Sequence, residues 1–507
     1  MAIKRYTATK DNTITNAFGV GLSTRATGSN MGASDILEIF SIYGQQQTTS
    51  SAATGSVELS RLLVEFPVST ISANRAANLI PASGSVNFFL RMFNARHSEQ
   101  LAKDITVNVL AVSQSWQEGT GLDMVSYTDT TRDSIDGSNW TNRERSAAWG
   151  KPGGEYHSSS YTAGQTMPNY TFTFTDGYED LELDVTAVVE EWIAGTQPNY
   201  GFGVFLTSSQ EGYLSNSSGL DSGPSLHNPA GAKRSYYTKK FFSRSSEFFF
   251  KKPVIEARWD SRIADDRGNF YASSSIASGA DNLNNLYLYN YIRGRLADIP
   301  RTEVVSLKLY ASSNSSPTGN ALATAIASKL QTGIYKAQIA IDTTASVLHD
   351  VWSGSIGGEY KTGSISVKSF NDENVLLANA YPRFTSAITN LKPKYVKNEQ
   401  ARLRVFSREI GKAPTLYTVA TSDIQPAIIQ SASFEVLRML DEHTVINNST
   451  GSSTYHTYLS YDNSGSYFDL DMSLLEPGYM YGIRLSYHVA GDWREQEEVF
   501  KFRVEDN

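Results

Sequence analysis

Apolar and polar residues alternate along many short stretches of the chain, which is the pattern of β-strands with one buried face. In residues 85–93 (SVNFFLRMF), Val86, Phe88, Leu90 and Met92 fall on one side. Residues 56–68, 104–112 and 201–209 show the same period of two. Their buried faces are expected to hold Leu62, Val64, Phe66 and Val68; Ile105, Val107, Val109 and Ala111; and Phe202, Val204 and Leu206. Such strands are typical of two sheets packed face to face.

One segment of the first half has helical periodicity instead. In residues 184–195 (DVTAVVEEWIAG), Asp184 is placed to cap the start and Gly195 to close the end. Glu190 and Glu191 fall off the apolar stripe and are expected in solvent. The stripe follows the spacing i, i+3, i+4, i+7, i+8 and consists of Val185, Val188, Val189, Trp192 and Ile193.

The second half also predicts strands, in two groups. The first group comprises residues 285–296, 303–312, 334–342 and 363–370, and the second 401–406, 433–440, 479–489 and 497–504. Between strands of the first group, residues 319–330 (GNALATAIASKL) predict a short helix with Leu322, Ile326 and Leu330 inward. Residues 379–389 resemble a linker, because Pro382 favours extended chain before it. Strand number alone indicates two immunoglobulin-like sandwiches.

Length and composition limit the alternatives. A chain of 507 residues suggests about three domains. It lacks cysteine, which excludes disulfides, cysteine zinc sites and cysteine nucleophiles. The net charge of −8 argues against a generally basic nucleic-acid binder. The first residues contain no apolar run typical of a secretion signal, and no run of 18 apolar residues predicts a membrane helix.

Several motifs of the first half resemble one family in the right order. The run LELDVTAVVEEWIAGTQPNYGFGVFLTSSQEG (181–212) resembles the DNRLRE-type jelly-roll module of cell-surface and phage proteins. The run SRLLVEFPVSTI (60–71) is similar to its basic-apolar strand, and VLAVSQSWQEGT (109–120) to its tryptophan loop, with Trp116, Glu118 and Gly119. Residues 253–259 resemble its closing strand. This copy has long polar insertions at about 120–170 and 208–245.

The complete chain resembles virion structural proteins of tailed marine, cyanophage-like phages. The segments TATKDNTITNAF (7–18) and NMGASDILEIFSIYGQ (30–45) carry this likeness. The resemblance implies an all-β protein with a jelly-roll sandwich at 1–260 that includes one short helix. The strand number of the second half, and not this resemblance, predicts the immunoglobulin-like sandwiches at 261–380 and 381–507. The resemblance also implies location in the virion, with other virion proteins and further copies of the chain as partners.

Candidate chemistry is sparse. The histidines form neither HExxH nor an i, i+4 pair, and neither GxSxG nor a phosphate-binding loop occurs. The acid-rich segment 176–184 could hold calcium, act as a glycosidase pair, or serve as a turn and helix cap. A second acid-rich stretch, 129–136, is interpreted as solvated. The seven histidines are His97, His157, His227, His349, His443, His456 and His488, and the acids of 176–184 are Asp176, Glu179, Asp180, Glu182 and Asp184.

Two further features leave alternatives open. The basic and aromatic segment 232–252 could bind single-stranded nucleic acid, dock on an acidic subunit, or form a strand with a basic face. Trp116, Trp140 and Trp149 could stack on sugars or anchor loops.

The sequence therefore predicts a non-enzymatic virion structural protein of the tail, neck or baseplate, which forms a homo-oligomer. No catalytic, cofactor-binding or metal residue is assigned, no cofactor is expected beyond the calcium considered above, and no membrane partner is expected. The alternatives are a protein that binds host-surface glycan and, less favoured, a polysaccharide-degrading enzyme.

Overall fold

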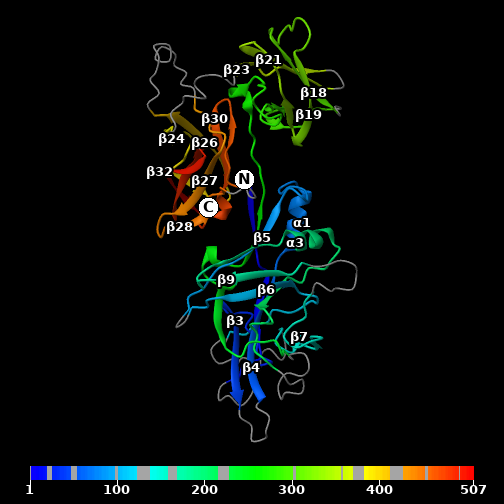
Figure 1. Ribbon diagram of the computed structural model, residues 1–507, viewed down its shortest axis with the longest axis vertical. Coiled ribbons are helices and arrows are strands. Elements are labelled where there is room, and N and C mark those ends of the chain that lie inside the picture. Colours follow the sequence, from blue (N-terminus) through cyan, green and yellow to red (C-terminus); the bar gives the residue numbers. More distant parts are fainter. Residues whose placement is uncertain are drawn as a thin grey trace. The chain divides into compact units, whose positions relative to one another are not determined.

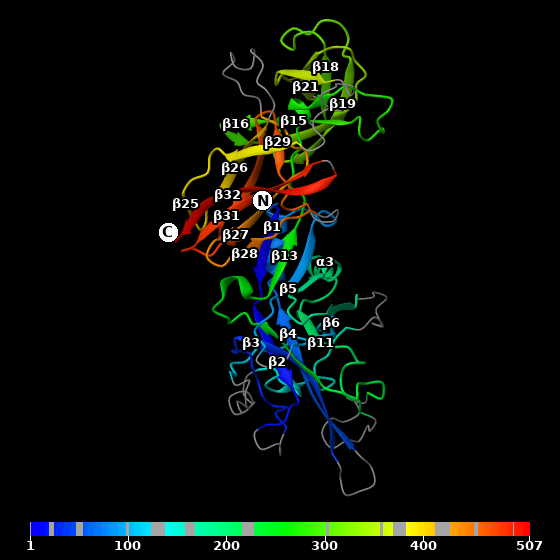
Figure 2. The same cartoon turned by 60° about the vertical axis from the view of Figure 1, so that its left-hand side comes forward.

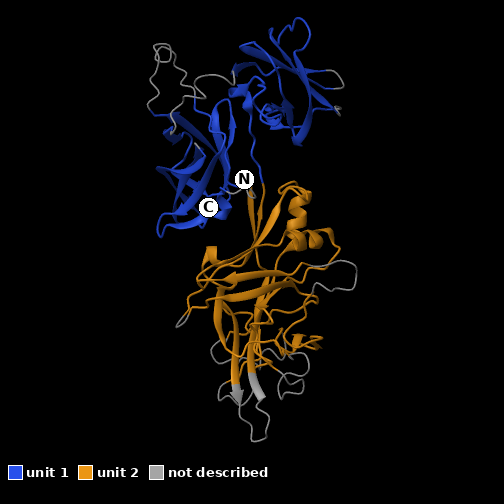
Figure 3. Cartoon of the chain, viewed as in Figure 1, with its two compact units in different colours: residues 1, 260–507 blue, residues 2–259 orange. Residues whose placement is uncertain are grey.

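The computed structural model describes residues 2–19, 25–46, 54–97, 101–122, 137–157, 168–214, 228–300, 304–354, 358–368, 382–410, 426–450, 455–489 and 491–506. Across these residues the protein is mostly β, with several sheets and two short α-helices (Figure 1). It divides into an N-terminal unit, Ala2–Trp259, and a C-terminal unit that begins at Asp260 (Figure 3).

The N-terminal unit contains a four-stranded antiparallel sheet in the order β1-β13-β5-β10. The last strand of the unit, β13, inserts between the first strand and β5, so both ends of the unit meet in one sheet (Figure 2). The strands are β1 (Ile3–Thr7), β5 (Asn87–Met92), β10 (Leu181–Asp184) and β13 (Val254–Arg258).

A larger sheet has the order β12-β3-β4-β11-β6-β9, with β2 also paired to β4. The strands β7 and β8 pair with each other in a separate small hairpin. The strands are β2 (Lys10–Thr15), β3 (Ile36–Gln46), β4 (Thr54–Glu65), β6 (Ile105–Ala111), β7 (Asn142–Glu144), β8 (Ala147–Ala148), β9 (Tyr170–Phe174), β11 (Phe202–Leu206) and β12 (Tyr236–Phe242).

The alternating positions form one hydrophobic core between these sheets. All four predicted faces of the first half are buried in it. The prediction for 56–68 is wrong in one respect, because β4 ends at Glu65 and Val68 begins a helix. Phe66 and Val68 reach the same core from this turn and helix.

Two α-helices pack together on this unit, α1 (Val68–Ala76) and α3 (Thr186–Ala194). The helix α3 ends as predicted, with Gly195 in the left-handed conformation at φ 73°. The expectation of a single helix is wrong, because the unit also contains α1. The sequence pattern does not reveal α1, since this helix buries only Val68 and Ile71. Glu190 is also misassigned to solvent, because it accepts two hydrogen bonds from the guanidinium of Arg75.

In the C-terminal unit, an eight-stranded sheet has the order β14-β23-β21-β18-β19-β20-β15, with β22 paired to β21. The four predicted strands of 285–370 all contribute to it, and β16-β17 form a separate hairpin. The elements are β14 (Phe270–Tyr271), β15 (Asn284–Tyr289), β16 (Tyr291–Ile292), β17 (Arg295–Leu296), β18 (Val305–Tyr310), β19 (Ala323–Gln331), β20 (Ile334–Ile339), β21 (Val347–Gly354), β22 (Glu359–Tyr360) and β23 (Ser364–Lys368).

The predicted helix at 319–330 is wrong, because residues 323–330 belong to the strand β19 and 319–322 precede it. Ala323, Ala325 and Ala327 pack against the core of this sheet, and Ile326 points away from it. The spacing of Leu322, Ile326 and Leu330 suits a helix and a strand face alike, and pairing with β18 and β20 selects the strand. All three leucine and isoleucine side chains are exposed rather than inward.

The last part of the chain contains two more sheets, β24-β26-β30-β29 and β25-β32-β31-β27-β28. The phenol of Tyr487 links them through the hydroxyls of Ser386 and Ser407, 2.6 and 3.0 Å away. The linker expected at 379–389 is partly wrong, because β24 occupies its second half. The strands are β24 (Phe384–Ile388), β25 (Lys394–Val396), β26 (Gln400–Glu409), β27 (Ala432–Arg438), β28 (His443–Ile446), β29 (Ser460–Asp462), β30 (Gly465–Asp471), β31 (Met480–Val489) and β32 (Asp492–Glu505).

Short 3₁₀ helices lie at Phe249–Lys251, Asp266–Gly268 and Met472–Leu474. The three-domain division at 260/261 and 380/381 stays a prediction. In the described part of the chain, no helix is long and apolar enough to cross a bilayer.

Candidate functional site

The acid-rich segment 176–184 is distributed over local structural tasks. At the turn before β10, the Glu179 carboxylate accepts the backbone N–H groups of Asp176 and Gly177, both at 2.6 Å. Asp180 accepts the N–H of Asn94 at 2.7 Å. Asp184 accepts the N–H of Thr186, the first residue of α3. It therefore caps the helix from the position before the N-cap residue, Val185.

A lysine ammonium occupies the centre of this turn. Lys239 of β12 is fully buried and donates to the carbonyl oxygens of Gly177 and Glu179, each at 2.9 Å, and to Oδ1 of Asn94 at 2.7 Å. Burial lowers the pKa of Lys239 to about 8, although Glu179 and nearby Asp180 oppose this shift. Two backbone carbonyl oxygens of this acid-rich segment therefore bind a cation that the chain itself supplies.

Glu182 belongs to an ion network on the four-stranded sheet. Its carboxylate lies 2.6 Å from Arg258 and 3.2 Å from Arg91. The same arginines flank Glu256, which is 2% exposed and also lies 2.6 Å from Arg5. Burial by itself raises the pKa of Glu256, but the three guanidinium groups hold it well below its ordinary value. This network joins all four strands of the sheet, β1, β13, β5 and β10, with Glu182 as the member on β10.

The basic and aromatic segment 232–252 contributes largely to local structure. It forms the edge strand β12, in which Phe241 is buried and Lys240 pairs with Glu38 at 2.8 Å. Arg244 makes a two-pronged ion pair with Glu118 of the tryptophan loop, at 2.5 Å. Tyr237, Phe248 and Phe249 stay exposed. The strand interpretation thus holds for residues 236–242, and docking by the exposed rings stays a prediction.

Glu118 also anchors a buried acid that sequence reasoning missed. It accepts the N–H of Asp11 at 2.8 Å, and Asp11 in turn accepts the N–H of Arg244. Asp11 is 1% exposed, and burial raises its pKa to about 7, with Arg244 opposing and Glu118 adding to that shift. The polar pattern of β2 carries no signal for this arrangement, because its partners lie more than 100 residues away.

The three tryptophans proposed for sugar stacking are all buried. Trp116, Trp140 and Trp149 are 2%, 1% and 4% exposed and form a second hydrophobic cluster against β2 and β4. Trp116 donates to the carbonyl of Tyr200 at 2.9 Å, and Trp149 to that of Asn139 at 3.0 Å. They are loop anchors, so sugar stacking on these rings is ruled out in this fold.

The histidines stay scattered. Within the described residues, no group of three or more histidine, aspartate or glutamate side chains is arranged to hold a metal ion. His157 and His456 are buried, and burial lowers the pKa of His157. His227 and the acid-rich stretch 129–136 lie outside the described residues.

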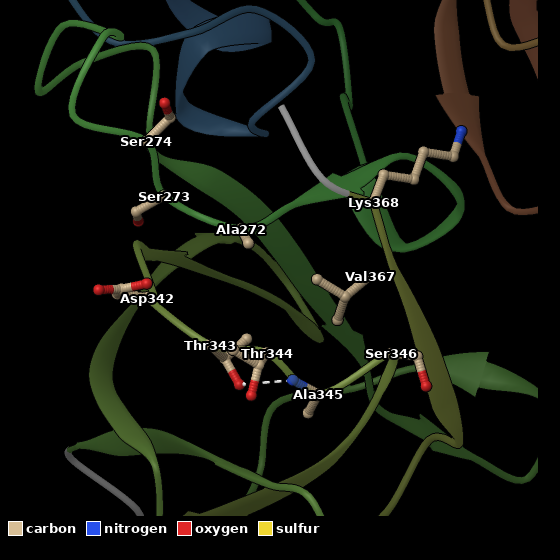
Figure 4. A pocket seen from close by; sticks show the side chains of 10 residues that line it. All are labelled: Ala272, Ser273, Ser274, Asp342, Thr343, Thr344, Ala345, Ser346, Val367 and Lys368. Carbon is tan, nitrogen blue, oxygen red and sulfur yellow. Dashed lines mark hydrogen bonds between the residues drawn. The ribbon is translucent and has the colours of Figure 1, made fainter. Parts of the chain in front are cut away.

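A hollow of about 410 Å³ lies beside β14 and β23 in the C-terminal unit (Figure 4). Its lining is mostly small and hydroxylic, and Thr343 accepts the N–H of Ala345 at 3.1 Å. Its two charged residues, Asp342 and Lys368, point away from one another in Figure 4, and Lys368 donates to Asn269. This lining offers no paired acid and base for catalysis.

The strand β19 presents the least expected surface. Leu322, just before the strand, and Ile326 and Leu330 within it are 50%, 75% and 51% exposed. Ile326 lies opposite Ser306 of β18, so a small side chain leaves it uncovered. Lys308, two positions along β18 from Ser306, is also exposed. The chain therefore exposes apolar side chains on a regular sheet face, where isolated soluble domains favour polar ones.

No protein-family model and no curated protein matches the chain, so the DNRLRE resemblance stays a prediction. Among solved structures, the chain is similar to the Yersinia pseudotuberculosis adhesin InvE, with 14% identity and a TM-score of 0.15. That match covers 46% of this chain and 56% of the adhesin. The chain thus spans little more than half of the adhesin's length.

The chain is also similar to a titin A168–A169 structure, with 8% identity and a TM-score of 0.14; the match covers 47% of this chain and 94% of that titin segment. For three N-terminal domains of the bacteriophage RB49 outer capsid protein Hoc, identity is 11% and the TM-score is 0.15. That match covers 47% of this chain and 67% of the three-domain Hoc segment. These are similarities to Ig-like domains over about half of the chain, and TM-scores this low carry no argument about function.

Proposed function

We propose that this chain is a non-enzymatic virion structural protein of a tailed phage. It binds copies of itself and other tail, neck or baseplate subunits through β-sandwich surfaces and loops. In this proposal residues 1–260 form the jelly-roll module, and 261–380 and 381–507 form the two immunoglobulin-like sandwiches. The two sheets of the N-terminal unit, packed around one core with both ends of the unit in one sheet, support the first assignment.

The exposed apolar positions of β19 are the observation that carries the proposal. Ile326 is 75% exposed on a sheet whose opposite face is well packed. Exposed apolar surface on a regular element is typical of contact with another protein. Binding through such a surface needs no catalytic group, in keeping with the internal partners of Glu179, Asp180, Glu182 and Asp184.

The decisive experiment locates the chain in particles. An antibody against the purified protein should label intact virions in negative-stain images at a fixed site, and mass spectrometry of purified virions should find the chain. Its absence from virions of a phage that expresses it would refute the proposal. Labelling at the tail, neck or capsid would also identify the position, which the sequence does not give.

The glycan-binding alternative rests on the tryptophans of the first module, and their burial removes that basis. A glycan array with the complete chain tests what is left of this alternative. Binding that survives Trp140→Phe would have to use another surface. The enzymatic alternative predicts loss of reducing-sugar release in Asp176→Asn, and unchanged release would reject it.

A further inference from the structure

The segment at the start of the C-terminal unit pairs with a strand near the end of the chain. It also contacts the sheet that directly follows it in sequence. Ala264 makes a parallel bridge with Tyr461 of β29, which is otherwise an edge strand of its four-stranded sheet. Tyr461 donates its N–H to the carbonyl of Ile263 at 2.9 Å, and its own carbonyl accepts the N–H of Asp265 at 3.0 Å. Residues 262–266, called the strap below, thus act as an additional strand.

Side chains fasten the strap on both sides. The phenol of Tyr461 donates to Oδ1 of Asp266 at 2.7 Å. Oδ2 of Asp266 accepts the backbone N–H and the side-chain amide of Asn285 on β15, at 2.7 and 3.1 Å. Ile263 packs with Tyr287 and Ile334 in a small apolar cluster. One strap therefore holds the β15 sheet and the β29 sheet together.

Arg262 adds a contact at the solvent side. Its guanidinium lies 5.7 Å from the ring centroid of Tyr455 and 5.4 Å from that of Tyr458. These rings precede β29, so they hold the start of the strap against the same sandwich. Cation–π contacts of this kind contribute roughly 0.5–1 kcal/mol at exposed sites.

The strap is also crowded with buried acids. Asp265 is 5% exposed and accepts the N–H of Arg267 at 3.2 Å. The charges of Asp266 and Asp462 raise the pKa of Asp265, and the charge of Asp265 in turn raises the pKa of the Tyr287 and Tyr289 phenols. The available cations are shared with other acids.

Three cations border these acids, and each also interacts with an acid other than Asp265. The Arg267 guanidinium lies 2.8 Å from the fully buried Asp350, and Arg404 lies 2.7 Å from Asp462. Lys336 acts on Asp266 from β20. Arg267 compensates a negative charge on Asp265, and it divides this role with Asp350 while the strap is bound.

We propose that the strap is a pH-sensitive latch between the two sheets, which is bound at acidic and near-neutral pH and opens as the pH rises. When the carboxyl of Asp265 loses its proton, the closed state must hold a charge next to Asp266 and Asp462. The open state lets water solvate that charge. The latch follows from the strap's contacts and does not depend on the proposed function.

The sign follows from the proton balance. Burial raises the pKa of Asp265 from 3.8 to about 7; Arg267 lowers it, and Asp266 and Asp462 raise it. A carboxyl whose pKa is higher in the closed state stabilises closure fully below its ordinary pKa. That stability is lost as the pH rises through the closed-state value. Between about pH 6 and about pH 8.5, the opening equilibrium should increase roughly tenfold.

Hydrogen exchange on the complete chain tests the latch. Exchange is measured at about pH 6 and about pH 8.5 and corrected for the intrinsic rate of each amide. The N–H groups of Asp265 and Tyr461 should lose roughly tenfold protection at the higher pH. Amides shared by β31 and β32, which have no contact with the strap's acids in this network, should keep theirs.

Two variants separate the charge from the contacts. Asp265→Asn should remove the pH dependence and keep the strap protected at both values. Tyr461→Phe should lower protection by a similar factor at both values and retain the pH dependence. Asp281→Asn, at an exposed acid that accepts a hydrogen bond from Ser278 in its own turn, is the matched control and should behave as wild type.

Equal protection of the wild-type strap at both pH values would overturn the proposal, as would an Asp265→Asn variant with wild-type pH dependence. Should Asp265→Asn fail to fold, the wild-type comparison and Tyr461→Phe still decide. The β31–β32 amides report folding in every sample.

Discussion

The ammonium of Lys239 lies 2.9 Å from the carbonyl oxygen of Gly177, although 62 positions separate the two residues. This hydrogen bond joins the edge strand β12 to the acid-rich turn before β10. The ring of Phe174 lies 4.3 Å from the same ammonium and shields it from solvent. The turn is therefore organised around an internal cation.

Replacing this cation should expose its role. Lys239→Met leaves the carbonyl groups of Gly177 and Glu179 buried without a donor, so we expect a loss of about 1–3 kcal/mol in the free energy of unfolding. Urea unfolding of the complete chain measures it. Lys240→Met, which removes only the more exposed pair with Glu38, should cost less than about 1 kcal/mol. Equal losses would show that the turn does not depend on Lys239.

The ion network around Glu256 predicts a specific acid sensitivity. Burial opposes the charged carboxylate, but Arg5, Arg91 and Arg258 together hold the pKa of Glu256 well below its ordinary value of 4.5. Because the pKa is lower in the folded state, the network stabilises the fold above 4.5. That stability is lost as the pH falls below this value.

Glu256→Gln should therefore weaken the N-terminal unit at neutral pH and flatten the decline in acid. The measurement is the urea midpoint between about pH 7 and about pH 3. Glu65→Gln, at the more exposed pair with Lys10, is the control and should keep the wild-type acid slope. A Glu256→Gln variant that declines as steeply as wild type would contradict the role of the network.

Gly201 predicts a steep steric penalty before β11. Its φ is +79°, and a Cβ there would lie 2.0 Å from the carbonyl oxygen of Val64. Its own carbonyl accepts the N–H of Val112 at 2.9 Å, so the backbone is held from two sides. We expect Gly201→Ala to cost about 3 kcal/mol or more in the free energy of unfolding.

The matched control is Gly195→Ala at the end of α3. Gly195 has a similar φ of +73°, but nothing lies within 4 Å of the position that an alanine Cβ would take. Backbone strain alone should cost about 1–2 kcal/mol there. Thermal unfolding of both variants separates the close approach from the left-handed conformation, and similar melting temperatures would reject the steric explanation.

Local periodicity was sufficient for much of the fold. Val86, Phe88, Leu90 and Met92 could be placed on one face because a strand side chain needs only a period of two. The same rule failed for Ile326, whose spacing with Leu322 and Leu330 fits either element. The core side of β19 consists of alanines, which are too weakly apolar to mark that side as the buried face of a strand.

The candidate sites were less predictable, because their partners are distant in sequence. Asp266 and Tyr461 are 195 positions apart, and Arg244 and Glu118 are 126 apart. No local pattern pairs them, since each contact exists only after the strands have taken their places in a sheet. The burial of Trp140 was equally hidden, because a loop tryptophan has the same sequence signature whether it anchors or is exposed.

The exposed position of Ile326 predicts a separation of stability from association. Because its side chain is 75% exposed, Ile326→Thr should change the free energy of unfolding by less than about 0.5 kcal/mol. Threonine retains the β-branched shape that suits a strand, so β19 should persist.

The same change removes apolar contact area, so native mass spectrometry should show a smaller oligomeric fraction than wild type at equal concentration. Thr324→Ser, two positions away on the same face of β19, is the control for a small substitution there and should leave assembly intact. If Ile326→Thr oligomerises as wild type does, subunits meet through another surface; if it unfolds more easily, Ile326 stabilises the strand itself.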